Sequence, residues 1–436
     1  MVQDDRARGG TRSTVVIIGV LFFLFGFVTW LNGPLITFVK LAFTLDDVSA
    51  FMVPMVFYMS YFFLALPSAA ILRRTGMKKG MTLGLFVMAV GAAAFGEFAT
   101  MRIFPGALAG LFVIGAGLAL LQTAVNPYIS IVGPIESAAQ RIAVMGICNK
   151  LAGILAPIVL GALVLHGVGD FEASLDAAPD AAARERLLAT FAAQIHAPYL
   201  GMAGMLVLLG LFVFFSPLPE IRPAESVSAT GDGRRLSSYP HLWLGVVCLF
   251  LYVGVEVMAG DAIGAYGRGF GLPTAQTAFF TSLTLGGMLV GYLAGLVLIP
   301  RIVSQERYLA ISAALGIVLT LCCYLTRDYV SVGFVAALGF ANAMMWPAIF
   351  PLAIRGLGRH TETGSAMMIM AICGGAVIPQ LFAVLKQYLP FQFVFLMLMA
   401  PAYAYILFYA LAGYRAGDVA GRPARRSVDG LGLAEG

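Results

Sequence analysis

Charged residues are scarce in this sequence. Asp, Glu, Lys and Arg make up 11% of the 436 residues, whereas hydrophobic residues make up 60%. A soluble domain contains about 25% charged residues, so these few charges could not cover a water-facing surface of this size. The composition therefore excludes an ordinary soluble protein and predicts that lipid is the main solvent of the folded chain.

Signatures of enzymes and of nucleotide binding are also missing. The chain has no G-x-x-x-x-G-K-[ST] phosphate loop and no H-E-x-x-H metal motif, and its four histidines are isolated from one another. The five cysteines lie inside apolar runs, without the spacing of a disulfide framework. The net charge of +5 comes from scattered basic residues, which argues against nucleic acid as a partner. We predict no enzyme activity, no metal site and no cofactor, apart from Na⁺ or H⁺ as a coupling ion.

Long apolar runs are what the sequence has in abundance. A membrane-spanning helix needs about 20 apolar residues to cross the hydrocarbon core. Runs of this length lie near residues 14–39, 49–72, 81–99, 105–129, 143–165, 198–216, 242–265, 278–299, 306–325, 330–353, 364–385 and 391–414. The sequence therefore predicts an all-α membrane protein with twelve transmembrane helices.

A polar, Pro- and Ser-containing segment divides the runs into two sets of six. We predict an N-terminal six-helix bundle at 1–216, a cytoplasmic linker at 217–241, a C-terminal six-helix bundle at 242–414 and a disordered cytoplasmic tail at 415–436. The longest loop lies on the side of the membrane opposite to the linker, and its residue pattern predicts a short surface helix over 177–194.

Basic residues set the expected orientation. With the N-terminus inside, the cytoplasmic segments hold 19 of the 27 Lys and Arg residues, and the opposite side holds seven. Lys and Arg accumulate in cytoplasmic loops, so both termini are predicted to be cytoplasmic.

Three charged residues lie deep inside the predicted spans, away from their ends. Glu256 and Asp261 occur in the seventh run and Lys150 in the fifth. Such groups cost about 2.5–3.5 kcal/mol each on insertion scales and mark transport pathways by default. Five residues apart, the two acids point about 140° away from each other on an ideal helix. Either could bind a proton or Na⁺, or accept hydrogen bonds from sugar hydroxyls. Lys150 could pair with Glu256 across the halves, as a functional or a structural pair, or extend to the membrane surface.

Amide and aromatic side chains also lie in the spans. Such groups suit a sugar, which offers hydroxyls around its rim and apolar C–H faces, although membrane bundles also use amides for hydrogen bonds between helices. The candidate sugar-binding residues are Trp30, Asn32, Gln122, Asn126, Asn149, Tyr252, Asn342 and Trp346.

Four segments resemble motifs of a known family. They are Leu-Asn-Gly-Pro-Leu at 31–35, Leu-Gln-Thr-Ala-Val-Asn-Pro-Tyr at 121–128, Tyr-Val-Gly-Val-Glu at 252–256 and Trp-Pro-Ala-Ile-Phe at 346–350. Together they resemble the fucose–galactose–glucose symporter family of the major facilitator superfamily. The resemblance implies two pseudo-symmetric six-helix bundles, a central sugar site and cation-driven uptake across the bacterial inner membrane.

The chain also departs from this family. Gly33 stands where the family's first helix has Asp, and Gln122 stands where the proton-linked fucose branch has Glu. Gln122 and Glu256 resemble the residues that the glucose/galactose branch has at these positions. This resemblance favours glucose or galactose over fucose as the substrate. We therefore expect a monomeric hexose symporter that works by alternating access. The alternatives are a passive sugar uniporter, a transporter of N-acetylglucosamine, fucose or mannose, and a multidrug exporter.

Overall fold

The computed structural model describes residues 2–131, 138–221, 235–299 and 302–417. Within these ranges twelve segments are long and apolar enough to cross a membrane. They begin and end at Thr14–Ala42, Asp47–Thr75, Met77–Thr100, Phe104–Asn126, Ala143–Leu163, Ala181–Phe215, Pro240–Gly260, Thr274–Leu298, Gln305–Leu325, Asp328–Ile354, Thr363–Leu385 and Phe391–Leu411. The described chain contains helices and no strands, so the predicted fold class and number of spans are confirmed.

Ten α-helices form the N-terminal half of the chain. They are α1 Val2–Trp30, α2 Asn32–Ala42, α3 Asp47–Ala50, α4 Met52–Thr75, α5 Met77–Thr100, α6 Phe104–Ile131, α7 Ala138–Leu163, α8 Val168–Asp176, α9 Ala181–Ala193 and α10 His196–Phe215. Helix α9 is the surface helix that the sequence predicts over 177–194. Helix α1 begins well before residue 14, the predicted start of the first apolar run.

Ten further α-helices form the C-terminal half. They are α11 Pro240–Gly260, α12 Ile263–Arg268, α13 Thr274–Thr277, α14 Phe280–Leu298, α15 Gln305–Leu325, α16 Asp328–Asn342, α17 Met345–Ile354, α18 Thr361–Met370, α19 Gly374–Leu385 and α20 Phe391–Leu411. Short 3₁₀ turns occur at Leu236–Ser238, Gly358–His360, Ala371–Cys373 and Gly413–Arg415. Residues 222–234 of the predicted linker and 418–436 of the predicted tail lie outside the described residues.

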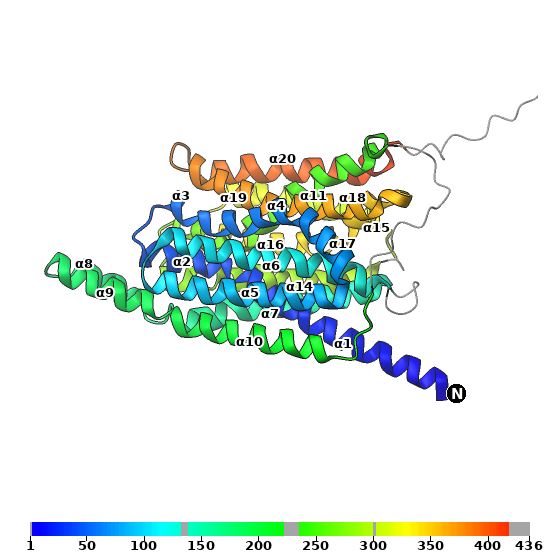
Figure 1. Ribbon diagram of the computed structural model, residues 1–436. Coiled ribbons are helices and arrows are strands. Elements are labelled where there is room, and N and C mark those ends of the chain that lie inside the picture. Colours follow the sequence, from blue (N-terminus) through cyan, green and yellow to red (C-terminus); the bar gives the residue numbers. More distant parts are fainter. Residues whose placement is uncertain (1, 132–137, 222–234, 300–301, 418–436) are drawn as a thin grey trace, which may run out of the picture.

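The long helices run roughly side by side (Figure 1). Helix α1 begins and α20 ends at one end of the molecule, and α8 and α9 lie at the other, which we call the distal end (Figure 1). Within the N-terminal half, α5 packs against α6 and α10, and α1 packs against α7. Within the C-terminal half, α15 packs against α20 and α11 against α17 and α19. The halves meet where α7 contacts α14 and where α4 contacts α18 and α19.

Two of the spans break where the site forms. The first breaks at Leu31, between α1 and α2. Pro34 then falls in the first turn of α2, where its missing N–H removes no helical hydrogen bond. The seventh breaks at Asp261, after α11. The hydroxyl of Thr281 donates to the carbonyl oxygen of Gly260 at 2.8 Å, which satisfies a backbone acceptor that the end of α11 leaves open.

Glycine allows α1 to lie directly on α7. An ideal Cβ on Gly26 would lie 1.9 Å from the backbone oxygen of Asn149, a distance that no side chain tolerates. Small residues of this kind let helix backbones approach closely in membranes. The contact fixes the end of α1 against α7, beside Asn149 and Lys150.

Candidate functional site

An ion pair joins the two halves of the chain, between a residue midway along α7 and one near the end of α11. The ammonium group of Lys150 on α7 lies 2.8 Å from Oε1 of Glu256 on α11, and both residues are buried. The structure thus places Lys150 against Glu256 and not at the membrane surface. Each charge is costly to bury alone, and close pairing with a hydrogen bond offsets that cost.

Trp30, at the end of α1, covers this ion pair. The ammonium of Lys150 lies 4.6 Å from the centroid of the Trp30 ring, within the range of a cation–π contact. The indole N–H donates to Oδ1 of Asn149 at 3.4 Å. An ideal Cβ on Gly153 or on Gly260 would lie 2.5 Å or 2.4 Å from the ring. Trp30 is therefore wedged between α7 and α11, on the boundary between the halves.

Asp261 has surroundings quite unlike those of Glu256. It is 3% exposed, and its Oδ2 accepts a hydrogen bond from the hydroxyl of Tyr58 at 3.5 Å. Its Oδ1 is buried without a hydrogen-bond partner in the described part of the chain, and so is Nδ2 of Asn32. An ideal Cβ on Gly33 would lie 3.3 Å from that Oδ1. The two acids therefore face different helices, as the 140° separation predicts: Glu256 faces α7, and Asp261 faces α2 and α4.

Three of the predicted amides have aromatic partners. Besides Asn149 with Trp30, Nε2 of Gln122 donates to the Tyr61 hydroxyl at 3.0 Å, and the Tyr403 hydroxyl donates to Oδ1 of Asn342 at 2.8 Å. These are contacts between helices, the structural alternative to sugar binding that the sequence leaves open.

The other predicted residues take different positions. Tyr252 is fully buried and lies beside Glu256. Asn126 is partly buried on α6. Trp346 stacks on Phe350 of the same helix, with ring centroids 5.9 Å apart, and joins neither acid. The structure thus brings Trp30, Asn32 and Asn149 to the acids and Lys150 at the boundary between the halves. The contacts of Gln122 and Asn342 each lie within one half.

Sequence reasoning missed the tyrosines that line this boundary. Tyr58 and Tyr61 lie on α4 with ring centroids 6.5 Å apart. Tyr58 contacts Asp261, and Tyr61 contacts Gln122. Their three-residue spacing puts both on one face of a helix, and this spacing is the signal in the sequence that could have indicated them. Tyrosine is ordinary in apolar helices, so the spacing alone is weak.

A second set of contacts joins the halves at the distal end. The carboxylate of Asp47 accepts hydrogen bonds from Lys40 of its own half and Lys386 of the other half, each at 2.5 Å. Arg268 donates to the hydroxyl of Thr37 at 3.0 Å. Burial lowers the pKa of Lys386, and the charge of Asp47 opposes that shift. These contacts hold the distal ends of the two halves together.

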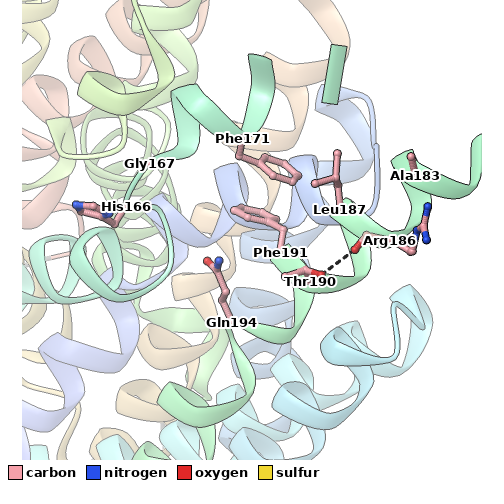
Figure 2. A pocket seen from close by; sticks show the side chains of 9 residues that line it. All are labelled: His166, Gly167, Phe171, Ala183, Arg186, Leu187, Thr190, Phe191 and Gln194. Carbon is pink, nitrogen blue, oxygen red and sulfur yellow. Dashed lines mark hydrogen bonds between the residues drawn. The ribbon is translucent and has the colours of Figure 1, made fainter. Parts of the chain in front are cut away.

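The distal end also carries a hollow of ≈ 470 Å³ between α8, α9 and the loop before them. Figure 2 shows His166, Phe171, Arg186, Phe191 and Gln194 around it. It shares no residue with the predicted site. In the described ranges, no group of three or more His, Cys, Asp and Glu side chains could hold a metal ion.

Comparison with known proteins agrees with this architecture. Residues 18–383 match the Major Facilitator Superfamily. The chain is 33% identical to a glucose/galactose transporter of Brucella abortus, over 90% of this chain and 92% of the relative. It is 28% identical to the L-fucose-proton symporter of Escherichia coli, over 86% and 87%.

A solved structure of similar fold is the crystal structure of the transporter FucP in the outward conformation. It matches with a TM-score of 0.74 at 24% identity and covers 93% of this chain and 99% of that one. The chain belongs to the Major Facilitator Superfamily, and its resemblance to the fucose–galactose–glucose symporter family is confirmed.

Proposed function

We propose that this protein is a secondary-active hexose transporter of the glucose/galactose type, located in a bacterial inner membrane. It works as a monomer by alternating access and couples sugar movement to a cation. The relatives named as glucose/galactose transporters and as L-fucose-proton symporters support the substrate class and the coupling.

The observation that carries the proposal is the buried ion pair between the two halves. Lys150 and Glu256 belong to different halves and meet at 2.8 Å, with Trp30 over the ammonium. When the halves separate, both charges need new hydrogen-bond partners, and the hydroxyls of a sugar can supply them. Trp30 offers an aromatic face to the apolar side of the sugar ring. The same residues can then bind a hexose in an open state and close on each other without it.

Orientation follows from the charge distribution. We propose that both termini are cytoplasmic and that the distal end faces outward, because most Lys and Arg residues lie at the other side. The bridge of Asp47 to Lys386 then closes the outer entrance. Transport requires this bridge to break when the outer entrance opens.

A passive sugar uniporter is the second candidate. The observation that favours it is the same ion pair, because Glu256 already has Lys150 as its cation and needs no further one. The two candidates differ in whether a gradient of H⁺ or Na⁺ drives accumulation.

Reconstituted vesicles test both candidates. Purified protein in liposomes should exchange labelled glucose or galactose, and an imposed pH or Na⁺ gradient should concentrate the sugar. An ionophore that collapses the gradient should stop accumulation but not exchange. Exchange without accumulation under either gradient would support the uniporter. No exchange of any hexose would refute the proposed function.

A binding measurement identifies which sugar is the substrate. Hexoses and N-acetylhexosamines should be screened by thermal unfolding, because a ligand stabilises the folded state by about 2.7 kcal/mol at one hundred times its Kd. The sugar that stabilises the protein should also be the one that is exchanged. Stabilisation by apolar drugs and not by sugars would support a multidrug exporter instead.

A further inference from the structure

Two buried acids and one buried lysine lie near each other at the boundary between the halves. Lys150 and Glu256 are paired, and Asp261 is left with a neutral tyrosine as its hydrogen-bond partner. Resting on the proposed function, we propose that Asp261 is the residue that carries the coupling ion, that this ion is a proton, and that Glu256 instead holds Lys150.

The groups that face Asp261 leave its negative charge uncompensated. Tyr58 on α4 donates to Oδ2, and the backbone N–H of Gly33 on α2 also faces the carboxylate. Neither group carries a positive charge, and Glu256 on α11 adds a second negative charge. Lys150 on α7 is the cation in range, and it is already bonded to Glu256. Burying an unpaired carboxylate costs far more than burying the neutral acid. A proton on Asp261 would remove the unpaired charge.

The free oxygen of Asp261 gives that proton a place. Oδ1 is buried and accepts no hydrogen bond in the described chain. Binding a proton forms one O–H bond at this carboxylate, and its release breaks the same bond, so no other bond or electron changes. The proton comes from water on the side to which the site is open and leaves to water on the other side.

Glu256 is poorly placed for the same role. Its Oε1 accepts a hydrogen bond from the ammonium of Lys150 at 2.8 Å. Protonating Glu256 would leave that ammonium buried without its counter-charge, and removing one partner of a buried pair is strongly destabilising. The ion pair therefore leaves Asp261, and not Glu256, as the buried carboxylate without a cationic hydrogen-bond partner.

The position of Asp261 links proton access to movement of the halves. It lies at the break after α11, in the C-terminal half, whereas Tyr58 on α4 and Gly33 on α2 belong to the N-terminal half. Separation of the halves must pull Asp261 away from both residues and admit water. The proton can then bind on one side and leave on the other, as coupled transport requires.

Vesicle assays of the wild-type protein and its variants test the assignment. Wild-type protein and Asp176→Asn, a control at an exposed acid on α8, should accumulate glucose under an inward proton gradient and alkalinise the outer medium. Asp261→Asn should bring the glucose concentration inside the vesicles only up to that outside, and it should take up no protons. Its rate of counterflow exchange of glucose should persist and no longer change with pH. Asp261→Glu should keep part of the proton-driven uptake.

Other outcomes overturn the assignment in distinct ways. Proton-driven accumulation by Asp261→Asn would refute it and leave the proposed function intact. The assignment is also refuted if Glu256→Gln, and not Asp261→Asn, exchanges glucose without accumulating it. It is refuted as well if a gradient of Na⁺, and not of H⁺, drives glucose accumulation by the wild type. Absence of hexose exchange in the wild type would instead refute the proposed function.

Infrared spectroscopy tests the protonation without transport. Purified wild-type protein at neutral pH should show the carbonyl band of a buried protonated acid, and the band should disappear in Asp261→Asn and shift in Asp261→Glu. If Asp261→Asn does not fold, the shift in Asp261→Glu decides. An unchanged band in the variants, or no such band in the wild type, would refute the proposal.

Discussion

The ion pair between Lys150 and Glu256 should be the most sensitive polar contact in the protein. At 2.8 Å and an effective dielectric constant of about 20, the attraction of two unit charges is about 6 kcal/mol. Desolvation offsets much of this gain, but removing one partner strands the other charge at a cost of about 3–5 kcal/mol. We expect Lys150→Met and Glu256→Gln each to lose about this much stability. The double variant Lys150→Met/Glu256→Gln should lose less stability than the less stable of the two single variants, because neither charge is then left without a partner.

Unfolding of the purified variants in one detergent measures these losses as a double-mutant cycle. Glu185→Gln is the control, because Glu185 pairs with Arg102 while its side chain is 65% exposed. Exposed pairs are worth about 0–1 kcal/mol, so this variant should be nearly as stable as the wild type. Losses that simply add in the Lys150→Met/Glu256→Gln protein would refute the reasoning. So would single variants that are no weaker than the control.

Three further predictions concern the helix contacts around the site. Gly26→Val should yield no monodisperse protein on size exclusion, because its Cβ would lie 1.9 Å from a backbone oxygen of α7; Gly204→Val, where the space is open, should fold normally. Asp47→Asn should weaken the bridge to Lys386 and lengthen spin-label distances across the distal end, and unchanged distances would contradict the closing role of this bridge. Trp30→Ala should reduce the thermal stabilisation by glucose; full stabilisation would exclude Trp30 from the sugar site.

Hydropathy predicted the spans well and their interruptions poorly. The last predicted run, 391–414, corresponds to Phe391–Leu411, because twenty apolar residues in lipid have few alternatives to a helix. The breaks at Leu31 and Asp261 were not predicted, although Pro34 lies near the first. A break depends on whether other helices can satisfy the freed backbone groups, as Thr281 does for α11, and this tertiary information is absent from a local pattern.

The same distinction holds for the site. Lys150 and Glu256 could be predicted as partners because buried charges are few and must find each other. Neutral residues carry no such requirement. Trp346 was predicted in the site and stacks on Phe350 without contacting either acid, and its part in sugar binding stays a prediction. Tyr58 was not predicted and contacts Asp261. Charge constrains the partner of a buried residue, whereas aromatic character and amide chemistry do not.

The position of Asp261 gives a meaning to the glycine at residue 33. The family that the chain resembles implies an aspartate at this position of the first helix. Here an ideal Cβ on Gly33 would lie 3.3 Å from Oδ1 of Asp261 and 2.5 Å from the hydroxyl of Thr281. A side chain at residue 33 therefore competes for space with the hydroxyl of Thr281 and with the present carboxyl group of Asp261. Under the proposal above, Asp261 supplies from the C-terminal half the acid that the resemblance leads one to expect in the N-terminal half. The exchanged variant Gly33→Asp/Asp261→Gly should for this reason recover proton-driven uptake that Asp261→Gly alone loses, and a failure to recover would show that the helix bearing the acid matters as much as its location.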